Sequence, residues 1–426
     1  MKHIVYWMSR ALRTIDNQAL YAAQQEALKF KEPLIVFFNL IPDFPYANTR
    51  NMDFLLHGLA EVSMKLNALN IPTVFAEGDA LENLTKLHNQ IDIRAIYTEH
   101  NPLKPIKQIH ETLSRWASVN QITFIRVNTA CVIPVWEAST KLEFSARTIR
   151  NKIMSNYQTY LDKSYPMITH PYHGLFGSVF SHELVSGVLN KYHYPILSLS
   201  KLVPGEDEAN IVLEDFIKHR LVNYDRRNET DSKGQSHLSA YLHFGMISPL
   251  KMIRDVKNTK HINADNFIEE AMVRRELAEN YCHYCEQYDS LLGAWPWAIT
   301  SLNKHRDDQR SYLYTLKQFE SALTHDLLWN TCQKMVLENG YLNSYLRMYW
   351  AKMVLFWSES PEEAIKILIH LNDTYFLDGR DPNGYTGIMW GVAAVHDRPW
   401  FDKPVHGLIR AIGKEGTLKK TKINLE

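Results

Sequence analysis

The chain has 426 residues, of which 45% are hydrophobic and 22% are charged, the composition of an ordinary globular protein. This length exceeds what one hydrophobic core usually organises, so we expect at least two domains. Lysine plus arginine and aspartate plus glutamate both total 47, which excludes a uniformly basic protein and requires any polyanion site to be a local patch.

No apolar run approaches the roughly 18 residues needed to cross a bilayer, and the amino terminus lacks the pattern of an export signal. We therefore expect no membrane partner and a cytoplasmic or nuclear location. The four cysteines include one CxxC pair, Cys282 and Cys285, without a second pair at zinc-ligand spacing. We expect structural cysteines and no metal site.

The first third of the chain alternates short β-branched or aromatic runs with longer segments of helical spacing. The predicted strands are 3–8, 33–40, 71–76, 93–98 and 122–127, and the predicted helices are 15–31, 52–70, 79–90 and 102–120. This order predicts a doubly wound parallel sheet, a Rossmann-like α/β domain. Residues 1–130 contain only Gly58 and Gly78, so neither a dinucleotide-binding turn nor a P-loop can be assembled.

Later segments are poor in strand signals. Residues 131–205 are rich in proline and glycine, and we interpret them as an interdomain linker with short helices. Residues 206–426 form the second, helical domain in this prediction. Its expected helices are 207–221, 248–257, 265–284, 324–339, 345–357 and 361–374.

Two features of the helical domain leave alternatives open. Trp350 and Trp357 are seven residues apart on one predicted helix and share a face, and Trp329 on the preceding helix could lie between or beside them. Such indoles fill a core or form an electron-hopping chain. The acid- and glycine-rich segment 371–385 predicts either a turn-rich loop without function or a loop that holds a cofactor.

A collinear series of motifs resembles class II cyclobutane pyrimidine dimer photolyases, in the photolyase/cryptochrome family. The resemblance extends over essentially the whole chain. The motifs are Tyr6-Trp7-Met8-Ser9-Arg10, Leu238-Ser239-Ala240-Tyr241-Leu242-His243-Phe244-Gly245, Arg274-Arg275-Glu276-Leu277-Ala278-Glu279-Asn280, Tyr312-Leu313-Tyr314, Tyr349-Trp350-Ala351-Lys352, Leu371-Asn372-Asp373, Asp378-Gly379-Arg380-Asp381-Pro382-Asn383-Gly384-Tyr385, Met389-Trp390 and His396-Asp397-Arg398.

The resemblance implies a light-driven DNA-repair enzyme, a deoxyribodipyrimidine photo-lyase. Its helical domain would hold FAD, and its α/β domain could hold a second, antenna chromophore. The expected partner is UV-damaged DNA whose dimer is flipped out of the duplex, a change that costs little for a poorly stacked lesion. In this family, excited reduced FAD passes an electron to the dimer and receives it back. No obligate protein partner is evident.

The resemblance also assigns site residues. Flavin contacts are expected from Tyr224, Leu238, Ser239, Asn372, Asp378 and Asp381, with the Asn372 amide facing flavin N5. Trp350, Trp329 and Trp357 match the photoreduction triad, with Trp350 nearest the flavin. Glu270 and Trp390 match lesion contacts, and Arg398, Trp400 and Arg410 match side chains inserted beside the flipped dimer.

Simpler alternatives exist for Glu270, for Leu238-Ser239 and for the carboxyl-terminal tail. Glu270 could form a helical i, i+4 ion pair with Arg274, and Leu238-Ser239 could be an ordinary helix cap. Beyond Asp397 the chain has seven lysines or arginines and three acids, which could be a local basic patch or a solvated, frayed terminus.

Three departures from the family pattern affect these expectations. Asn343-Ser344 replaces a usual His-Gly pair, Ala411-Ile412 replaces Tyr-Met, and 417–420 replaces a basic, cysteine-containing tail. The neutral net charge favours weaker, more salt-sensitive DNA binding. A photolyase-like blue-light photoreceptor without repair is therefore the main alternative, and a non-catalytic DNA-binding protein is a third. A deazaflavin, a folate or no antenna all remain compatible with the sequence.

Overall fold

The computed structural model describes residues 2–174 and 176–425. Contacts divide the chain into two compact units, each assembled from separate stretches of sequence. The sheet unit comprises Met1–Pro134, Asn156–Glu214 and Leu238–Asn258, and the helical unit comprises Val135–Ser155, Asp215–His237 and Thr259–Glu426. Within the described ranges, no helix is both long and apolar enough to cross a membrane.

The sheet unit is built on five parallel strands in the order β3-β2-β1-β4-β5, which confirms the predicted doubly wound sheet. The central strand β1 pairs on both sides, with Tyr6 opposite Val36 in β2 and Tyr97 in β4. Because helices cover both faces, β1 and β2 are apolar at almost every position rather than alternating. The strands are β1 (His3–Trp7), β2 (Leu34–Leu40), β3 (Thr73–Glu77), β4 (Ile93–Glu99) and β5 (Thr123–Val127).

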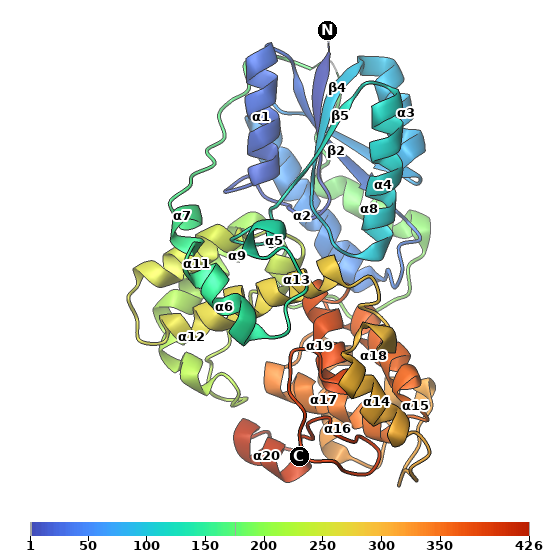
Figure 1. The fold of residues 1–426 in the computed structure, drawn as a ribbon. Coiled ribbons are helices and arrows are strands. Elements are labelled where there is room, and N and C mark those ends of the chain that lie inside the picture. The colour runs from blue at the N-terminus through green and yellow to red at the C-terminus, as the bar shows by residue number, and fades with distance from the viewer. Residues whose placement is uncertain (1, 175, 426) are drawn as a thin grey trace. The chain divides into compact units, whose positions relative to one another are not determined.

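Helices cover the two faces of this sheet, with α1 on one side and α3 and α4 on the other (Figure 1). We call the buried cluster under α3 and α4 the sheet core; it includes Trp7, Phe37, Leu84 and Leu113, and its members are all hydrophobic. Helix α2 is the longest of the unit and also buries one face, with Phe54 and Leu59 fully buried. The helices are α1 (Gln18–Phe30), α2 (Thr49–Ala68), α3 (Ala80–Ile91), α4 (Lys104–Val119), α7 (Tyr157–Leu161), α8 (His182–Tyr192), α9 (Glu206–Asp215), α10 (Ser239–His243) and α11 (Pro249–Asn258).

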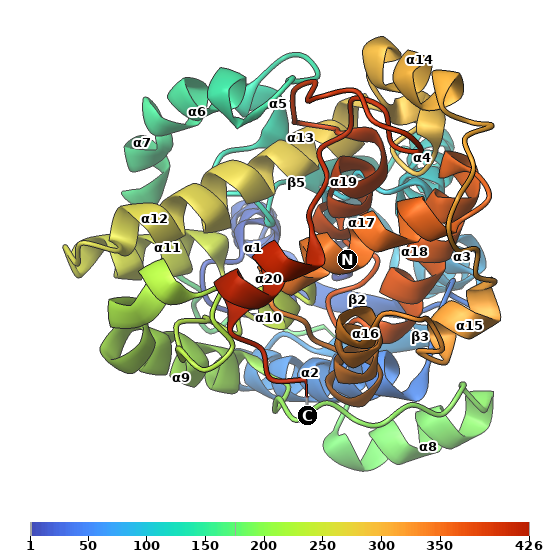
Figure 2. The same ribbon diagram turned by 90° about the horizontal axis from the view of Figure 1, so that it is seen from below.

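The helical unit has α17 at its centre, in contact with α16, α18 and α19 (Figure 2). The amino end of α18 has the features that start a helix: Ser360 accepts a hydrogen bond from the Glu363 amide, and Pro361 follows. The elements are α5 (Val135–Ala138), α6 (Ala146–Met154), η1 (Phe216–Arg220), η2 (Leu221–Arg226), α12 (Ala264–Ile268), η3 (Glu269–Arg274), α13 (Arg275–Tyr284), η4 (Leu291–Gly293), α14 (Pro296–Lys304), α15 (Leu316–Glu320), α16 (Leu327–Asn339), α17 (Ser344–Trp357), α18 (Pro361–Tyr375), α19 (Pro382–Ala393) and α20 (Lys414–Thr421).

The structure changes three predicted segments. The predicted helices 207–221 and 265–284 both contain a π-helical turn, η1 and η3, a feature that often accompanies functional sites. The predicted polar segment 371–385 is a loop only over residues 376–381, because α18 continues to Tyr375 and α19 begins at Pro382. Asp381 caps α19 by accepting from the Asn383 amide, with proline in the first turn.

Candidate functional site

Three indoles form a continuous stack inside the helical unit. The Trp350 and Trp329 rings are nearly parallel, with centroids 6.3 Å apart, and the Trp329 and Trp357 centroids are also 6.3 Å apart at a steep angle. Trp350 and Trp357 belong to α17, whereas Trp329 comes from α16 and lies between them. Of the two placements that the sequence allowed for Trp329, the structure selects the bridging one.

The indole N–H groups are held by amide oxygens. Trp350 Nε1 donates to Gln333 Oε1 at 2.9 Å, and Trp329 Nε1 donates to the Trp350 carbonyl at 2.9 Å. An amide oxygen accepts a hydrogen bond but is not a base, so these partners orient the rings without offering to take the proton. This arrangement suits electron transfer between rings that keep their protons.

The stack runs from a sealed interior toward the surface of the unit. Trp329 and Trp350 are essentially inaccessible, and Trp357 has the largest exposed fraction of the three, at 7%. The Trp357 ring also contacts His325 and Tyr314, with centroids 4.9 and 6.0 Å away. Trp357 is therefore the end from which an external reductant has the shortest route to the stack.

A polar network surrounds Asn372 near the carboxyl end of α18. Its side-chain oxygen accepts a hydrogen bond from Arg347, and its Nδ2 donates to Asp373 Oδ1 at 2.7 Å. Arg347 can only donate and an ionised carboxylate can only accept, so these neighbours fix the orientation of the amide. Arg347 also pairs with Asp378 at 3.0 Å. The structure thus brings together two predicted site residues, Asn372 and Asp378, through an arginine that was not predicted.

Asp373 is the buried anion of this network. Besides Asn372, it accepts from the Arg380 amide at 2.8 Å and from the Tyr385 hydroxyl at 2.7 Å. Burial, followed by the nearby Asp373, raises the pKa of Tyr385, so the phenol remains a neutral donor. Three donors satisfy the charge of a fully buried carboxylate, which would otherwise be costly to desolvate.

Glu270 lies in the π-helical turn η3 and is 45% exposed. It accepts from Arg227 at 2.9 Å, while Arg274 pairs with Glu269 at 3.1 Å, so the structure does not form the Glu270–Arg274 ion pair that was the simpler alternative. The Arg227 guanidinium also covers the buried Tyr224 ring, 4.7 Å from its centroid. The expected lesion contact and the expected flavin contact are therefore joined through one arginine.

The substituted residue Asn343 supports this region. Its Oδ1 accepts from the Tyr345 amide at 2.9 Å and so caps α17, and its Nδ2 donates to the Arg227 carbonyl at 2.7 Å. The departure from the family pattern therefore supplies a helix cap rather than disturbing local packing.

Trp390 on α19 is half-buried, and a buried lysine lies over its ring. Lys352 Nζ is 4.4 Å from the ring centroid and donates to the Trp390 carbonyl at 3.2 Å. Burial lowers the pKa of Lys352 to about 7; Asp397 acts in the opposite direction, and Arg410 adds to the lowering. Lys352 therefore fixes the backbone and ring of an expected lesion-pocket residue.

Arg398, Trp400 and Arg410 form one cluster on the loop that follows α19. The guanidinium carbons of Arg398 and Arg410 are 5.1 and 4.8 Å from the Trp400 ring centroid. Arg398 is exposed, and the other two side chains are half-buried. Two cations beside an aromatic ring are suited to a ligand that carries both phosphates and planar bases.

The carboxyl-terminal tail is ordered as α20, contrary to the frayed alternative. Thr417 and Thr421 are fully buried, and the Thr421 carbonyl accepts from the Thr230 amide at 2.8 Å. Lys414 pairs with Asp326 at 3.3 Å and Lys422 with Glu229 at 2.9 Å. These lysines are engaged within the unit, which leaves the arginine pair around Trp400 as the better-placed cationic surface.

Comparisons with known proteins agree with this geometry. Residues 4–170 match the family model described as DNA photolyase. The chain is 38% identical to the deoxyribodipyrimidine photo-lyase of Arabidopsis thaliana, covering 99% of this chain and 87% of the relative. It is 39% identical to that of Potorous tridactylus, covering 98% and 79%. The chain belongs to the DNA photolyase family.

A solved structure extends the fold comparison over both units of the photolyase. The archaeal photolyase of Sulfolobus tokodaii superposes with a TM-score of 0.74 at 18% identity, covering 99% of this chain and 87% of the other. That structure holds two FAD molecules and is described as implying a novel light-harvesting cofactor. The likeness confirms the photolyase/cryptochrome fold.

The residues around Asn372 fit the FAD that photolyases bind. The amide retains a second N–H beyond the one given to Asp373, and Arg347 with Asp378 offers both a donor and an acceptor. The Arg380 Nε–H is buried without an acceptor among residues 2–174 and 176–425, and an acceptor-rich ligand could accept its hydrogen bond. A Cβ at Gly384 would lie 2.7 Å from Asn372 Nδ2, so only glycine leaves this amide in place.

The remaining predicted flavin contacts belong to two different units of the chain. Tyr224 and Asp381 belong to the helical unit, whereas Leu238 and Ser239 belong to the sheet unit. Leu238 is buried at the amino end of α10, and Ser239 is exposed as its first residue. Asp381 is buried and serves as the cap of α19.

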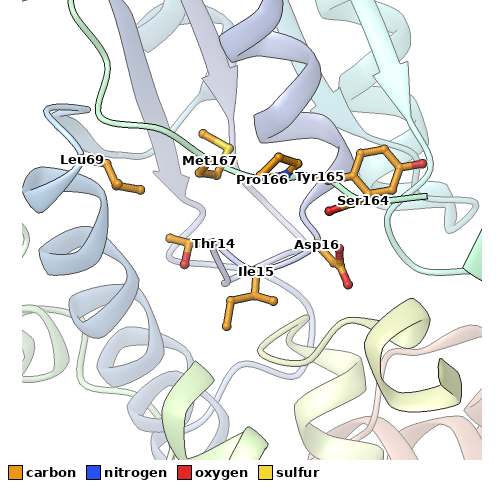
Figure 3. Close-up of a pocket in the computed structure, with 8 residues that line it drawn as sticks. All are labelled: Thr14, Ile15, Asp16, Leu69, Ser164, Tyr165, Pro166 and Met167. Atoms are coloured by element: carbon orange, nitrogen blue, oxygen red, sulfur yellow. The ribbon is translucent and has the colours of Figure 1, made fainter. Parts of the chain in front are cut away.

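A pocket of about 350 Å³ lies in the sheet unit, between the loop after β1 and segment 164–167 (Figure 3). Its acid, Asp16, pairs with Arg254 at 2.9 Å, and Thr14 donates to Glu206 through both its amide and its hydroxyl. Because these polar groups already have internal partners, the pocket offers them weakly to a ligand, and we assign it no role.

Sequence reasoning missed four functional candidates: Arg347, Lys352, Asp373 and Gln333. Lys352 stands in a quoted motif and Arg347 precedes it on the same helix, but a basic residue on a helix is normally solvent-exposed, and nothing local signals burial. Their partners lie far away in sequence, as with Trp350 and Gln333.

Proposed function

We propose that this photolyase is a class II enzyme that repairs cyclobutane pyrimidine dimers in DNA, with its electron-transfer and lesion-binding residues in the helical unit. Light-driven DNA repair is the activity of the family. The chain is accordingly a deoxyribodipyrimidine photo-lyase, which is a carbon–carbon lyase. The class II assignment is supported by the collinear motifs from Tyr6-Trp7 to His396-Asp397-Arg398. Its substrate would be UV-damaged DNA in the nucleoid or nucleus.

The observation that carries the proposal is the Trp350–Trp329–Trp357 stack, which the Phe376 ring joins to the Asn372 network. The Phe376 centroid lies 5.6 Å from that of Trp350 and 3.9 Å from the Arg347 guanidinium carbon. When bound, reduced FAD supplies the electron on absorbing light. Arg347 and Asp373 would hold the Asn372 amide in one orientation toward the flavin, and Asp378 would offer an acceptor beside Arg347. The three indoles would return the enzyme to its reduced form by moving electrons inward from Trp357.

The lesion would be received by the other group of predicted residues. Glu270, held by Arg227, offers a carboxylate that would accept a hydrogen bond from an N–H group of the dimer. Trp390, fixed by Lys352, offers an aromatic wall. Arg398 and Arg410 would contact phosphates on either side of the gap left by the flipped dimer.

The Trp350→Phe variant tests the electron-transfer part of the proposal. Phenylalanine keeps the packing but is much harder to oxidise, so we expect photoreduction of the oxidised enzyme to slow by at least tenfold, about 1.4 kcal/mol of activation free energy. Repair by chemically reduced variant should stay near the wild-type rate. Trp136→Phe, at an exposed indole outside the stack, is the matched control. Photoreduction at the wild-type rate in Trp350→Phe would exclude this stack as the route.

A further inference from the structure

The loop after α19 is folded back on itself. Trp400 N donates to the Leu408 carbonyl at 2.8 Å, and Lys403 and Gly407 exchange backbone hydrogen bonds of 3.2 and 2.8 Å. Gly407 has φ +54°, and a side chain there would clash with Ser301. We call residues 400–408 the tip loop.

Side chains near the carboxyl end of α14 anchor the tip loop. Asp402 accepts from Lys304 at 2.5 Å and interacts with His305 Nε2 at 2.7 Å. The Val405 amide donates to Asp308 at 2.8 Å, and the Leu408 amide donates to Ser301 Oγ at 2.8 Å. Asp308, and then Asp402, raise the pKa of His305, which favours the charged form of the anchor.

Phe401 is the large hydrophobic residue that the tip loop exposes to solvent. It is 81% exposed, between the clustered Trp400 and the anchored Asp402. A phenyl ring left in water forgoes the favourable free energy of burying its apolar surface. Because the loop is already held by backbone and side-chain bonds, a partner that covers this ring would have little loop ordering to impose.

The charges next to Phe401 indicate which partner that is. Arg398 and Arg410 flank the adjoining Trp400 ring, and Lys403 follows two residues later. An exposed aromatic ring among cations complements a polyanion with flat faces, since bases stack on aromatic side chains while phosphates bind the cations. Nucleic acid repeats this combination of flat base and phosphate at every residue, so DNA is the occupant to which the charges point.

We propose that Phe401 is an aromatic wedge that stacks on a base face exposed in damaged duplex DNA, with Arg398 and Arg410 neutralising the adjacent phosphates. This inference rests on the proposed DNA-repair function and adds a residue to it. Apolar wedges placed between base steps are an established way for proteins to occupy an unstacked site. The wedge predicts preference for damaged over intact duplex, whereas the arginines alone favour any DNA.

The test compares Phe401→Ala with Phe401→Tyr, which keeps the aromatic ring. Val119→Ala is the matched control, because Val119 is 82% exposed on the sheet unit. For a duplex with one thymine dimer we expect Phe401→Ala to raise Kd by roughly tenfold, equivalent to 1.4 kcal/mol. Phe401→Tyr and Val119→Ala should bind within twofold of wild type. The dependence of Kd on salt should be unchanged in Phe401→Ala, because no phosphate contact is lost.

A 2-aminopurine placed opposite the dimer reports stacking directly. Wild type should quench its fluorescence relative to Phe401→Ala at saturating protein. Equal Kd and equal fluorescence in wild type and Phe401→Ala, with wild-type repair intact, would overturn the wedge alone. An equal loss of binding in Phe401→Tyr and Phe401→Ala would also overturn it, since the aromatic ring would then not matter. Absence of light-dependent repair by wild type would instead refute the proposed function.

Discussion

The sheet core and the centre of the helical unit bury different kinds of side chain. Around Trp7, Leu84 and Leu113, the sheet core consists of hydrophobic residues packed between strands and helices. At the centre of the helical unit, burial extends to ionisable side chains such as Lys352 and Asp373, and the indoles have specific hydrogen-bond partners. The first arrangement stabilises a fold, whereas the second fixes the orientation of polar and redox-active groups at a cost in desolvation.

The largest expected effect comes from removing the buried anion of the Asn372 network. Asp373→Ala would leave the Tyr385 hydroxyl and the Arg380 amide without their acceptor. We therefore expect the free energy of unfolding to fall by about 3–5 kcal/mol and bound FAD to be lost. Urea unfolding followed by circular dichroism, with flavin absorbance per protein, measures both. Asp373→Asn, which keeps the shape and part of the bonding, should lose less. If Asp373→Ala kept the stability and the flavin content of wild type, the buried polar groups of the helical unit would not be needed to hold the site, and the contrast with the sheet core would fail.

A cavity in the sheet core should affect stability alone. Leu84→Ala removes a fully buried side chain and should destabilise the sheet unit by about 3 kcal/mol. Leu84→Met, close to the original volume, should cost less than about 1.5 kcal/mol. In conditions where the variant remains folded, photoreduction should proceed at the wild-type rate. Slower photoreduction in folded Leu84→Ala would show that the sheet core also shapes the redox site.

Lys352 gives the helical unit a pH dependence above pH 7, whereas the buried His110 beside Trp7 of the sheet core has a pKa lowered by burial to about 3 and acts only at lower pH. Its folded pKa is about 7, below the roughly 10.4 of an unfolded lysine. Between these values the unfolded chain binds more protons, so stability should rise as pH increases from 7 to 9 and fall as pH drops through 7. Lys352→Met should lose about 2 kcal/mol of this rise.

Urea midpoints measured at pH 7 and 9 give the comparison for Lys352. The charged groups that affect its titration are Asp397 and Arg410, so Arg410→Met serves as a control that leaves the lysine in place. An identical pH dependence in wild type and Lys352→Met would mean that the buried amine stays protonated in the folded protein.

The sheet was the more predictable region because its signals are local. Short β-branched runs alternating with helical spacing determine strand and helix identity, and the right-handed connection rule then limits the topology. The observed strands β1, β2 and β4 begin or end within two residues of their expected limits. A strand that is buried on both faces of a parallel sheet requires little more than a short apolar run, and that run can be read directly from the sequence.

The helical site was predictable only in part. Seven-residue spacing placed Trp350 and Trp357 on one face, but the interposition of Trp329 depends on how α16 packs on α17. Helix α19 was missed because the turn-forming residues before it outweighed the Asp381-Pro382 start signal. The pairing of Arg347 with Asn372 and Asp378 joins residues at least 25 positions apart, which no local pattern encodes.

The central claim is that this chain repairs pyrimidine dimers with light. Chromatographic analysis of an oligonucleotide that carries one thymine dimer, incubated with reduced protein in the dark and under blue light, tests it most directly. We expect intact thymines to be recovered under blue light and the dimer to persist in the dark. Persistence of the dimer under blue light, with FAD bound and photoreducible, would contradict the account and favour a photoreceptor.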